Sequence, residues 1–104
     1  MNIIDLRDII DNQEIEPEPY AAWKKALWED VGYQIEDVAE NEPTMIPASD
    51  FTEYAQELAE DIGAIDPDAK WPVYCIDWER AARELKMDYT SVRVNGTTYY
   101  FRAF

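Results

Sequence analysis

Acidic side chains in the middle of the chain are the residues whose type and spacing could do chemistry. From position 49 to position 66, six of eighteen residues are Asp or Glu, and none is Lys or Arg. Carboxylates recur there every three or four positions, so on a helix they would form one line with a step of about 5 Å. The line consists of Asp50, Glu53, Glu57 and either Glu60 or Asp61. Because like charges at this spacing repel one another, the pattern suggests that the counterions belong to another molecule.

Other reactive groups give weaker signals. The chain has no histidine, which is the commonest general base and metal ligand in proteins. Cys75 lacks a histidine to activate it, and its neighbours Tyr74 and Ile76 favour a buried structural thiol. Asp66 and Asp68 could touch a hard cation, but their spacing does not match a calcium-binding loop, and we expect them to face a basic partner with the other acids. The sequence therefore predicts no enzyme, no metal site and no cofactor.

The charge of the whole chain favours a basic partner. Nine Lys and Arg against 23 Asp and Glu give a net charge of −14. Twelve acids and three bases give −9 in residues 1–43, seven acids and one base give −6 in residues 44–70, and four acids and five bases give +1 in residues 71–104. A field this negative excludes direct binding of DNA, RNA or an anionic membrane as the main function. Composition alone also fits acids that only keep the protein soluble.

The length and patterning indicate how these acids are positioned. A chain of 104 residues predicts a single domain, with a helical part over residues 1–43 and an α+β part over residues 44–104. We expect an α+β protein that is mostly helical, with about four helices and a C-terminal β-hairpin or small three-stranded antiparallel sheet. No apolar run approaches the roughly 20 residues that span a bilayer, and no signal peptide is visible, so we expect a cytoplasmic protein.

The N-terminal part is expected to hold two helices, one over residues 2–13 and one that starts at Tyr20. Pro17 and Pro19 separate them, and Gly32 either ends the second helix or only weakens it. A second set of acids accompanies these helices, namely Glu29, Asp30, Glu36, Asp37 and Glu40. Trp28 lies off the apolar stripe, so it is either an exposed anchor for a partner or packs under the first helix.

The C-terminal part is expected to carry the core. A short extended segment over residues 44–47 is an edge strand or third strand, and Ser49 or Asp50 caps a helix that ends at Gly63. Asp77 caps the next helix, and Asn95-Gly96 predicts a type I′ hairpin turn. The expected core residues are Leu58, Ile62, Trp78, Leu85, Val92, Val94 and Tyr99, and the expected buried aromatic residues also include Trp23, Phe51 and Trp71. Removal of residues 1–15 should then leave a cooperatively folding protein.

Three stretches of the C-terminal part follow one another with short spacers: "FTEYAQELAEDIGAI", "CIDWERAARELKMDYTSV" and "NGTTYYFR". Over about residues 50–102 they resemble the C-terminal region of ArdA-type antirestriction proteins. The matching residues are Glu57, Glu60, Asp61, Gly63, Ile76, Asp77, Trp78, Glu79, Ala82, Arg83, Glu84, Leu85, Asp88, Tyr89, Phe101 and Arg102. Members of that family are encoded by phages or plasmids and mimic DNA to occupy the DNA site of restriction–modification enzymes.

The resemblance implies an inhibitor that acts in the cytoplasm of a bacterial host. It would present its acids to the DNA- or RNA-binding groove of a defence enzyme, from a restriction–modification or a CRISPR system. Two other functions stay open, namely an acidic adaptor or structural module without DNA mimicry, and a regulator or enzyme subunit. Whether the chain acts as a monomer or a homodimer also stays open.

Overall fold

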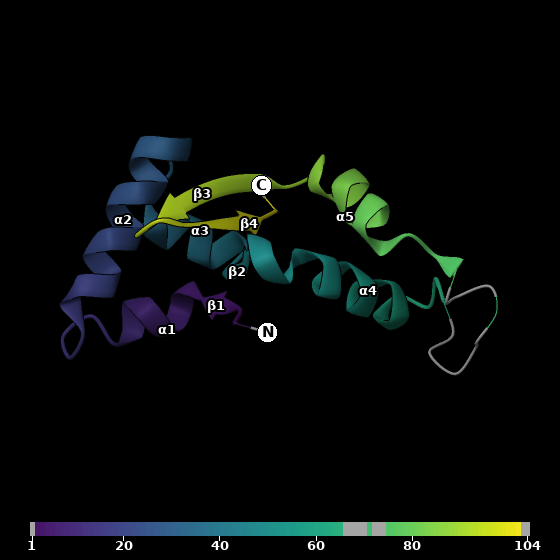
Figure 1. Ribbon diagram of the computed structural model, residues 1–104. Coiled ribbons are helices and arrows are strands. Elements are labelled where there is room, and N and C mark those ends of the chain that lie inside the picture. Colours follow the sequence, from purple (N-terminus) through teal and green to yellow (C-terminus); the bar gives the residue numbers. More distant parts are fainter. Residues whose placement is uncertain (1, 66–70, 72–74, 103–104) are drawn as a thin grey trace.

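The protein is mostly helical with one small sheet, which confirms the predicted α+β class (Figure 1). The computed structural model describes residues 2–65, 71 and 75–102. In chain order the described elements are β1 (Ile4–Asp5), α1 (Leu6–Asp11), α2 (Pro17–Val31), α3 (Ile35–Asn41), β2 (Thr44–Pro47), the 3₁₀ turn η1 (Ala48–Asp50), α4 (Phe51–Asp61), α5 (Trp78–Lys86), β3 (Thr90–Val94) and β4 (Thr97–Phe101). Gly32, with φ of 76°, ends α2, so residues 20–42 form two helices rather than one.

The sheet has one strand more than the sequence predicts. Its order is β1-β2-β4-β3, and neighbouring strands are antiparallel. The two-residue strand β1 was hidden within an apolar pattern of helical spacing. Its pairing with β2 places Ile4 opposite Met45, so β2 lies inside the sheet and the expectation of an edge strand is wrong.

The hairpin formed by β3 and β4 confirms the strongest local prediction. Asn95 and Gly96 both have positive φ, at 51° and 84°, as a type I′ turn requires. The register places Val94 opposite Thr97 and Val92 opposite Tyr99. Because side chains alternate along a strand, Val92 and Val94 share one face, and both are buried.

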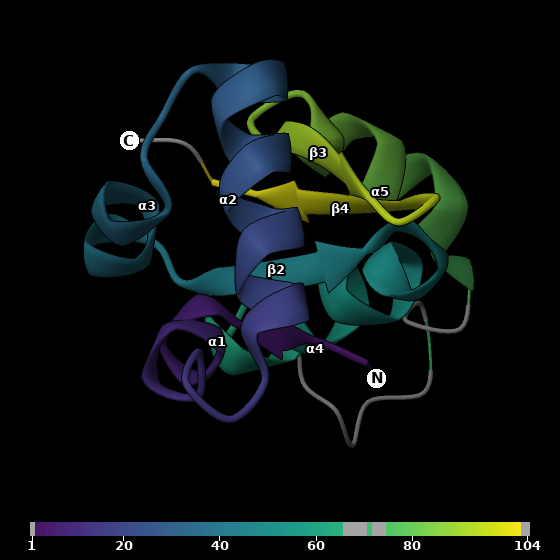
Figure 2. The same ribbon diagram turned by 90° about the vertical axis from the view of Figure 1, so that its left-hand side faces the viewer.

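The N-terminal helices, and not the C-terminal ones, cover this face of the hairpin. Figure 2 shows α2 lying across the strands. The main core consists of Leu6, Trp23, Leu27, Ile35, Val38, Ala39, Met45, Val92, Val94 and Phe101. Leu6 is 0% exposed within it. The prediction that residues 44–104 alone cover the hairpin is therefore wrong: the hairpin needs an apolar helix face, and α2 supplies it. Whether the N-terminal helix is dispensable stays a prediction, and the burial of Leu6 argues against it.

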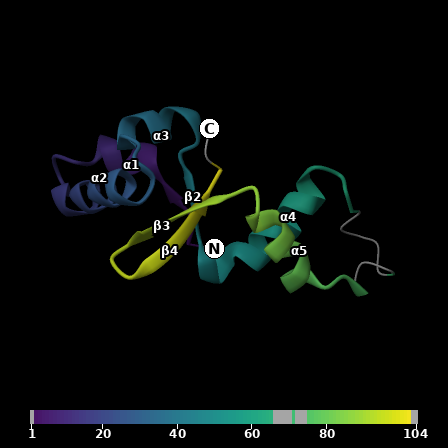
Figure 3. The ribbon, with the colours of Figure 1, turned by 90° about the horizontal axis from the view of Figure 1, so that it is seen from above.

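Helices α4 and α5 pack against each other and extend away from the sheet as a helical arm (Figure 3). A smaller core lies where the arm begins, and consists of Ile46, Phe51, Ala55 and Ala82. Further along the arm Leu58 is half-buried and Ile62 is 70% exposed, so the predicted burial of Ile62 is wrong. Trp78 and Leu85 are half-buried, while Trp71 and Cys75 are exposed, contrary to their predicted burial. Among the described residues no third layer covers this part of the arm, so each helix buries only the side that faces the other.

Four aromatic residues join the arm to the sheet, and we call them the aromatic junction: Phe51, Tyr54, Tyr89 and Tyr100. The Phe51 ring centroid lies 5.2 Å from those of both Tyr89 and Tyr100. The Tyr54 and Tyr89 hydroxyls are 3.0 Å apart and share a hydrogen bond. The Lys86 ammonium lies 5.1 Å from the Tyr100 ring centroid, at cation–π distance.

The two predicted helix caps have different outcomes. Asp77 Oδ1 accepts a hydrogen bond from the Arg80 backbone N–H at 3.1 Å, which confirms the cap of α5. Asp50 precedes α4 but makes no cap hydrogen bond, so the prediction that its side chain caps this helix is wrong. The turn η1 gives Asp50 a helical backbone instead of the extended backbone of a capping residue, and its side chain is used elsewhere.

Candidate partner-binding surfaces

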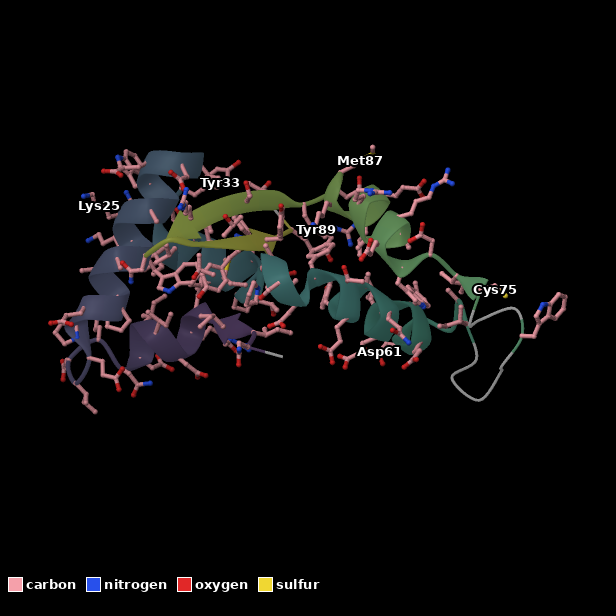
Figure 4. All side chains as sticks on the ribbon, in the orientation of Figure 1. Lys25, Tyr33, Asp61, Cys75, Met87 and Tyr89 are labelled. Carbon is pink, nitrogen blue, oxygen red and sulfur yellow. The ribbon has the colours of Figure 1, made fainter. Side chains whose placement is uncertain are left out.

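The carboxylates of α4 form the line that the sequence predicts. Glu53, Glu57 and Asp61 are exposed and recur every four residues, while Glu60 is half-buried. Asp61 points to the side of α4 away from α5 (Figure 4). The helix contains no Lys or Arg, and no described ion pair involves any of its acids. The exposed line therefore spans about 12 Å at a rise of about 1.5 Å per residue.

Asp50 does not continue this line as a free acid. Its side chain is half-buried, and Oδ2 accepts a hydrogen bond at 2.8 Å from the backbone N–H of Asn2. The carboxylate thus ties the N-terminal strand region to the start of the arm. Asp66 and Asp68, which were also predicted to bind a partner, lie outside the described residues.

A second acidic surface lies on α2 and α3, at the other end of the molecule from the arm (Figure 1). Its predicted members are all exposed: Glu29, Asp30, Glu36, Asp37 and Glu40. The long dimension of the protein is 49 Å, against 23 Å in each of the others. The sequence-predicted acids therefore form two separate surfaces rather than one continuous ridge.

Two acids of the second surface have structural partners. Asp30 Oδ2 accepts a hydrogen bond from the Arg93 backbone N–H at 3.0 Å, which ties the end of α2 to β3. Glu36 Oε1 accepts a hydrogen bond from the Tyr20 hydroxyl at 2.6 Å. This hydrogen bond lowers the pKa of Glu36 and raises the pKa of Tyr20 from their ordinary values. Asp30 therefore joins α2 to the hairpin and Glu36 joins α2 to α3, while both add negative charge.

Few carboxylates have a basic partner in the part of the chain that the structure describes. Two ion pairs occur there, Arg7 with Asp5 at 2.8 Å and Arg80 with Glu84 at 3.7 Å. The hydrogen bond from Arg7 lowers the pKa of Asp5 below its ordinary value. The remaining described acids form no ion pair, so the excess negative charge is presented to solvent.

Trp28 is 57% exposed, which excludes its packing under α1. It lines an open hollow together with Ala21, Lys24, Lys25 and Gln34. Sequence reasoning singled out Trp28 but missed the two lysines. Their spacing of three and four residues from Trp28 could have revealed them, because that spacing puts all three side chains on one helical face.

Three further observations bear on the class of function. Within residues 2–65, 71 and 75–102, no cluster of His, Cys, Asp and Glu side chains is arranged to hold a metal ion. No helix in the same part of the chain combines the length and apolar character needed to cross a membrane. Comparison of the chain with protein-family models, curated proteins and solved structures gave no match. The resemblance to antirestriction proteins therefore stays a prediction from the quoted residues.

Proposed function

We propose that the protein is a non-enzymatic inhibitor that binds the DNA- or RNA-binding groove of a defence enzyme in a bacterial host. Its carboxylates would take the place of nucleic-acid phosphates. The observation that carries this proposal is the net charge of −14 combined with only two ion pairs among the described residues. The resemblance of residues 50–102 to antirestriction proteins makes restriction–modification enzymes the first target class, with CRISPR enzymes as the second.

The arm is the surface best suited to enter such a groove. The two packed helices extend from the body, and the exposed line on α4 carries Glu53, Glu57 and Asp61. Each strand of duplex DNA presents a phosphate charge about every 3.4 Å along the axis. Carboxylates on α4 recur about every 6 Å, which gives a sparser line of the same sign. Basic grooves that attract phosphates would attract this line by the same long-range force.

The proposal is tested by DNA cleavage with a purified type I restriction–modification enzyme. Addition of the protein should slow cleavage, and raising the concentration of substrate DNA should restore the rate, because both ligands compete for one groove. The control is a parallel assay with an unrelated nuclease that cleaves the same DNA, whose rate should not change when the protein is added. Inhibition that is independent of DNA concentration would reject competition for the DNA site.

The exposed apolar residues of the arm region favour a second candidate function. Ile62 is 70%, Trp71 is 72% and Met87 is 84% exposed. Large apolar side chains at a surface are common anchors of protein–protein interfaces. An acidic adaptor would use these residues to bind a partner, and its acids would only keep it soluble. Binding by an adaptor would depend weakly on salt and would not be competed by DNA.

A further inference from the structure

The arm is joined to the body at its base, where both of its chain connections lie (Figure 3). Residues 47–51 lead from β2 through η1 into α4, and residues 86–90 lead from α5 into β3. The buried residues of α4 are Phe51 and Ala55, which lie in its first two turns. The direction in which the arm leaves the body is therefore set by a few residues around these two connections.

The first connection is held by a carboxylate that α4 does not use. Asp50 is the last residue of η1 and directly precedes α4, but its side chain makes no cap hydrogen bond with the helix. Its Oδ2 instead accepts a hydrogen bond at 2.8 Å from the backbone N–H of Asn2, which lies 48 positions earlier. A hydrogen bond to an ionised acceptor is stronger than one between two neutral groups. Asp50 thus joins the base of the arm to the N-terminal segment.

The N-terminal segment reaches Asp50 because of its direction at the edge of the sheet. β1 pairs antiparallel with β2, with Ile4 opposite Met45, so the chain before Ile4 continues toward the end of β2, where η1 follows. Leu6, at the other side of β1, is fully buried in the main core. A two-residue strand at a sheet edge opens more readily than such a core. Residues 2–5, which we call the N-terminal strap, are thus anchored firmly at Leu6 and weakly along β2.

The second connection is held by the aromatic junction, without the N-terminal strap. Tyr89 lies between α5 and β3, and its hydroxyl shares a hydrogen bond at 3.0 Å with that of Tyr54 on α4. The Tyr89 and Phe51 ring centroids are 5.2 Å apart. These contacts join the two helices to each other and to the C-terminal side of the sheet. The Asp50–Asn2 hydrogen bond is therefore a separate attachment, at the other chain connection.

We propose that the N-terminal strap fixes the angle between the arm and the body, with Asp50 as its point of attachment. While the strap is attached, the acidic line of α4 and the acidic surface of α2 and α3 keep one separation. When the strap detaches, the arm turns about η1 and this separation varies. A ligand that binds only one of these two arrangements would shift the protein toward it. The angle of the arm does not depend on what the acids bind, so this device stands apart from the proposed function.

The distance between spin labels on the arm and the body tests the proposal. Lys25 on α2 and Glu57 on α4 are exposed, so Lys25→Cys and Glu57→Cys provide the labelling sites, and Cys75→Ser removes the one natural cysteine. Pulsed electron paramagnetic resonance of this full-length chain should give one narrow distance distribution. Addition of Asp50→Ala removes the acceptor and should widen the distribution about two-fold or more. Asp50→Asn keeps an acceptor oxygen and should stay close to the original width.

Two further variants separate release of the strap from a general loosening of the fold. Glu53→Ala removes an exposed acid in the first turn of α4 and should leave the width unchanged. Ile4→Ala loosens β1 without touching the arm and should widen the distribution. Combined with Asp50→Ala it should add little, because both changes release the same strap. Circular dichroism would check that every variant keeps its helices. An unchanged width in Asp50→Ala, or an equal widening in Glu53→Ala, would overturn the proposal.

Discussion

The body of the protein and its helical arm are built in different ways. In the body, α1, α2 and α3 close over one face of the sheet, and ten buried residues form a continuous core. In the arm, α4 and α5 pack mainly against each other within the described residues, and four buried residues lie near the junction with the sheet. The closed core that stabilises the protein and the arm that exposes much of its surface are therefore different parts of the molecule. The body fixes the fold, while the arm exposes an acidic line and apolar side chains.

Removal of residues 1–15 should have the largest effect on this comparison. It deletes β1 and the fully buried Leu6, whose backbone N–H donates to the Pro43 carbonyl at 2.9 Å. Since Leu6 lies in the same core as Val92, the hairpin would lose part of its cover. We expect the truncated chain to lose its sharp thermal transition in circular dichroism. A truncated chain that unfolds cooperatively near the original midpoint would show that the body does not need its N-terminal segment.

Matched leucine substitutions compare the two parts directly. Leu27 is 0% exposed in the body, whereas Leu85 is half-buried in the arm. Leu27→Ala should lower the free energy of unfolding by about 3–5 kcal/mol, because it leaves a cavity that is closed on all sides. Leu85→Ala should cost about 1–2 kcal/mol, since part of its surface is already in water. Chemical denaturation measures both, and equal losses would remove the distinction between body and arm.

The Tyr54–Tyr89 hydrogen bond tests how firmly the arm is attached. Tyr89→Phe removes this hydrogen bond from the aromatic junction and should cost about 0.5–1.5 kcal/mol of unfolding free energy. Hydrogen exchange should show the loss first in α4 and α5. A Tyr99→Phe variant serves as the control, because Tyr99 packs against Trp23 in the body. Faster exchange in the body than in the arm of the Tyr89 variant would contradict the predicted role of the junction.

Tyr89 should also make the stability of the protein depend on pH in the alkaline range. Burial, and then the hydrogen bond with Tyr54, raise the pKa of Tyr89 above its ordinary value. The folded state therefore favours the neutral phenol, and its contribution is complete below the pKa of the unfolded chain, near 10. As the pH rises above about 10, the unfolded chain releases this proton more readily and stability falls. Denaturation midpoints between neutral and alkaline pH should show this fall, and Tyr89→Phe should reduce it.

Reversal of the α4 acids should have the smallest effect on stability and a large effect on inhibition. Glu53, Glu57 and Asp61 are exposed, so changing all three to Lys should alter the unfolding free energy by only a few tenths of a kcal/mol per site. The three lysines would repel one another as the three acids do, so no large change in helix stability is expected. If this variant folds normally but no longer slows DNA cleavage, the arm carries the acids that bind. Normal inhibition would assign that role to the surface on α2 and α3.

Features that depend on residues close together in the sequence could be predicted. Features that depend on which helix packs on which strand could not. Asn95-Gly96 acts through its own backbone geometry and Asp77 through a hydrogen bond to a residue three positions on, so the hairpin turn and the α5 cap could be predicted. The burial of Leu6 depends on which helices cover the hairpin. An apolar stripe shows that a helix has a buried face, but not which surface that face packs against. Ile62 continues the α4 stripe, yet it is 70% exposed, because no further helix or strand among the described residues covers that part of the arm.

The candidate surfaces show the same division. The α4 line follows from a spacing of three or four residues and could be predicted. The sequence alone could not show that Asp50 is not a free acid of this line, because its hydrogen bond joins residues 48 positions apart. The spacing of Lys24 and Lys25 from Trp28 places them on one helical face, but the hollow beside them also needs Gln34, which lies beyond the end of α2.

The central claim is that the acids of this protein take the place of nucleic-acid phosphates, and the salt dependence of binding tests it most directly. The target is a purified restriction–modification enzyme, and affinity is measured between about 50 and about 200 mM salt with and without duplex DNA. We predict a fall in affinity of about ten-fold or more over this range, together with displacement by DNA. The three-site α4 variant should show a shallower fall. Tight binding that hardly changes with salt and is not displaced by DNA would contradict the account.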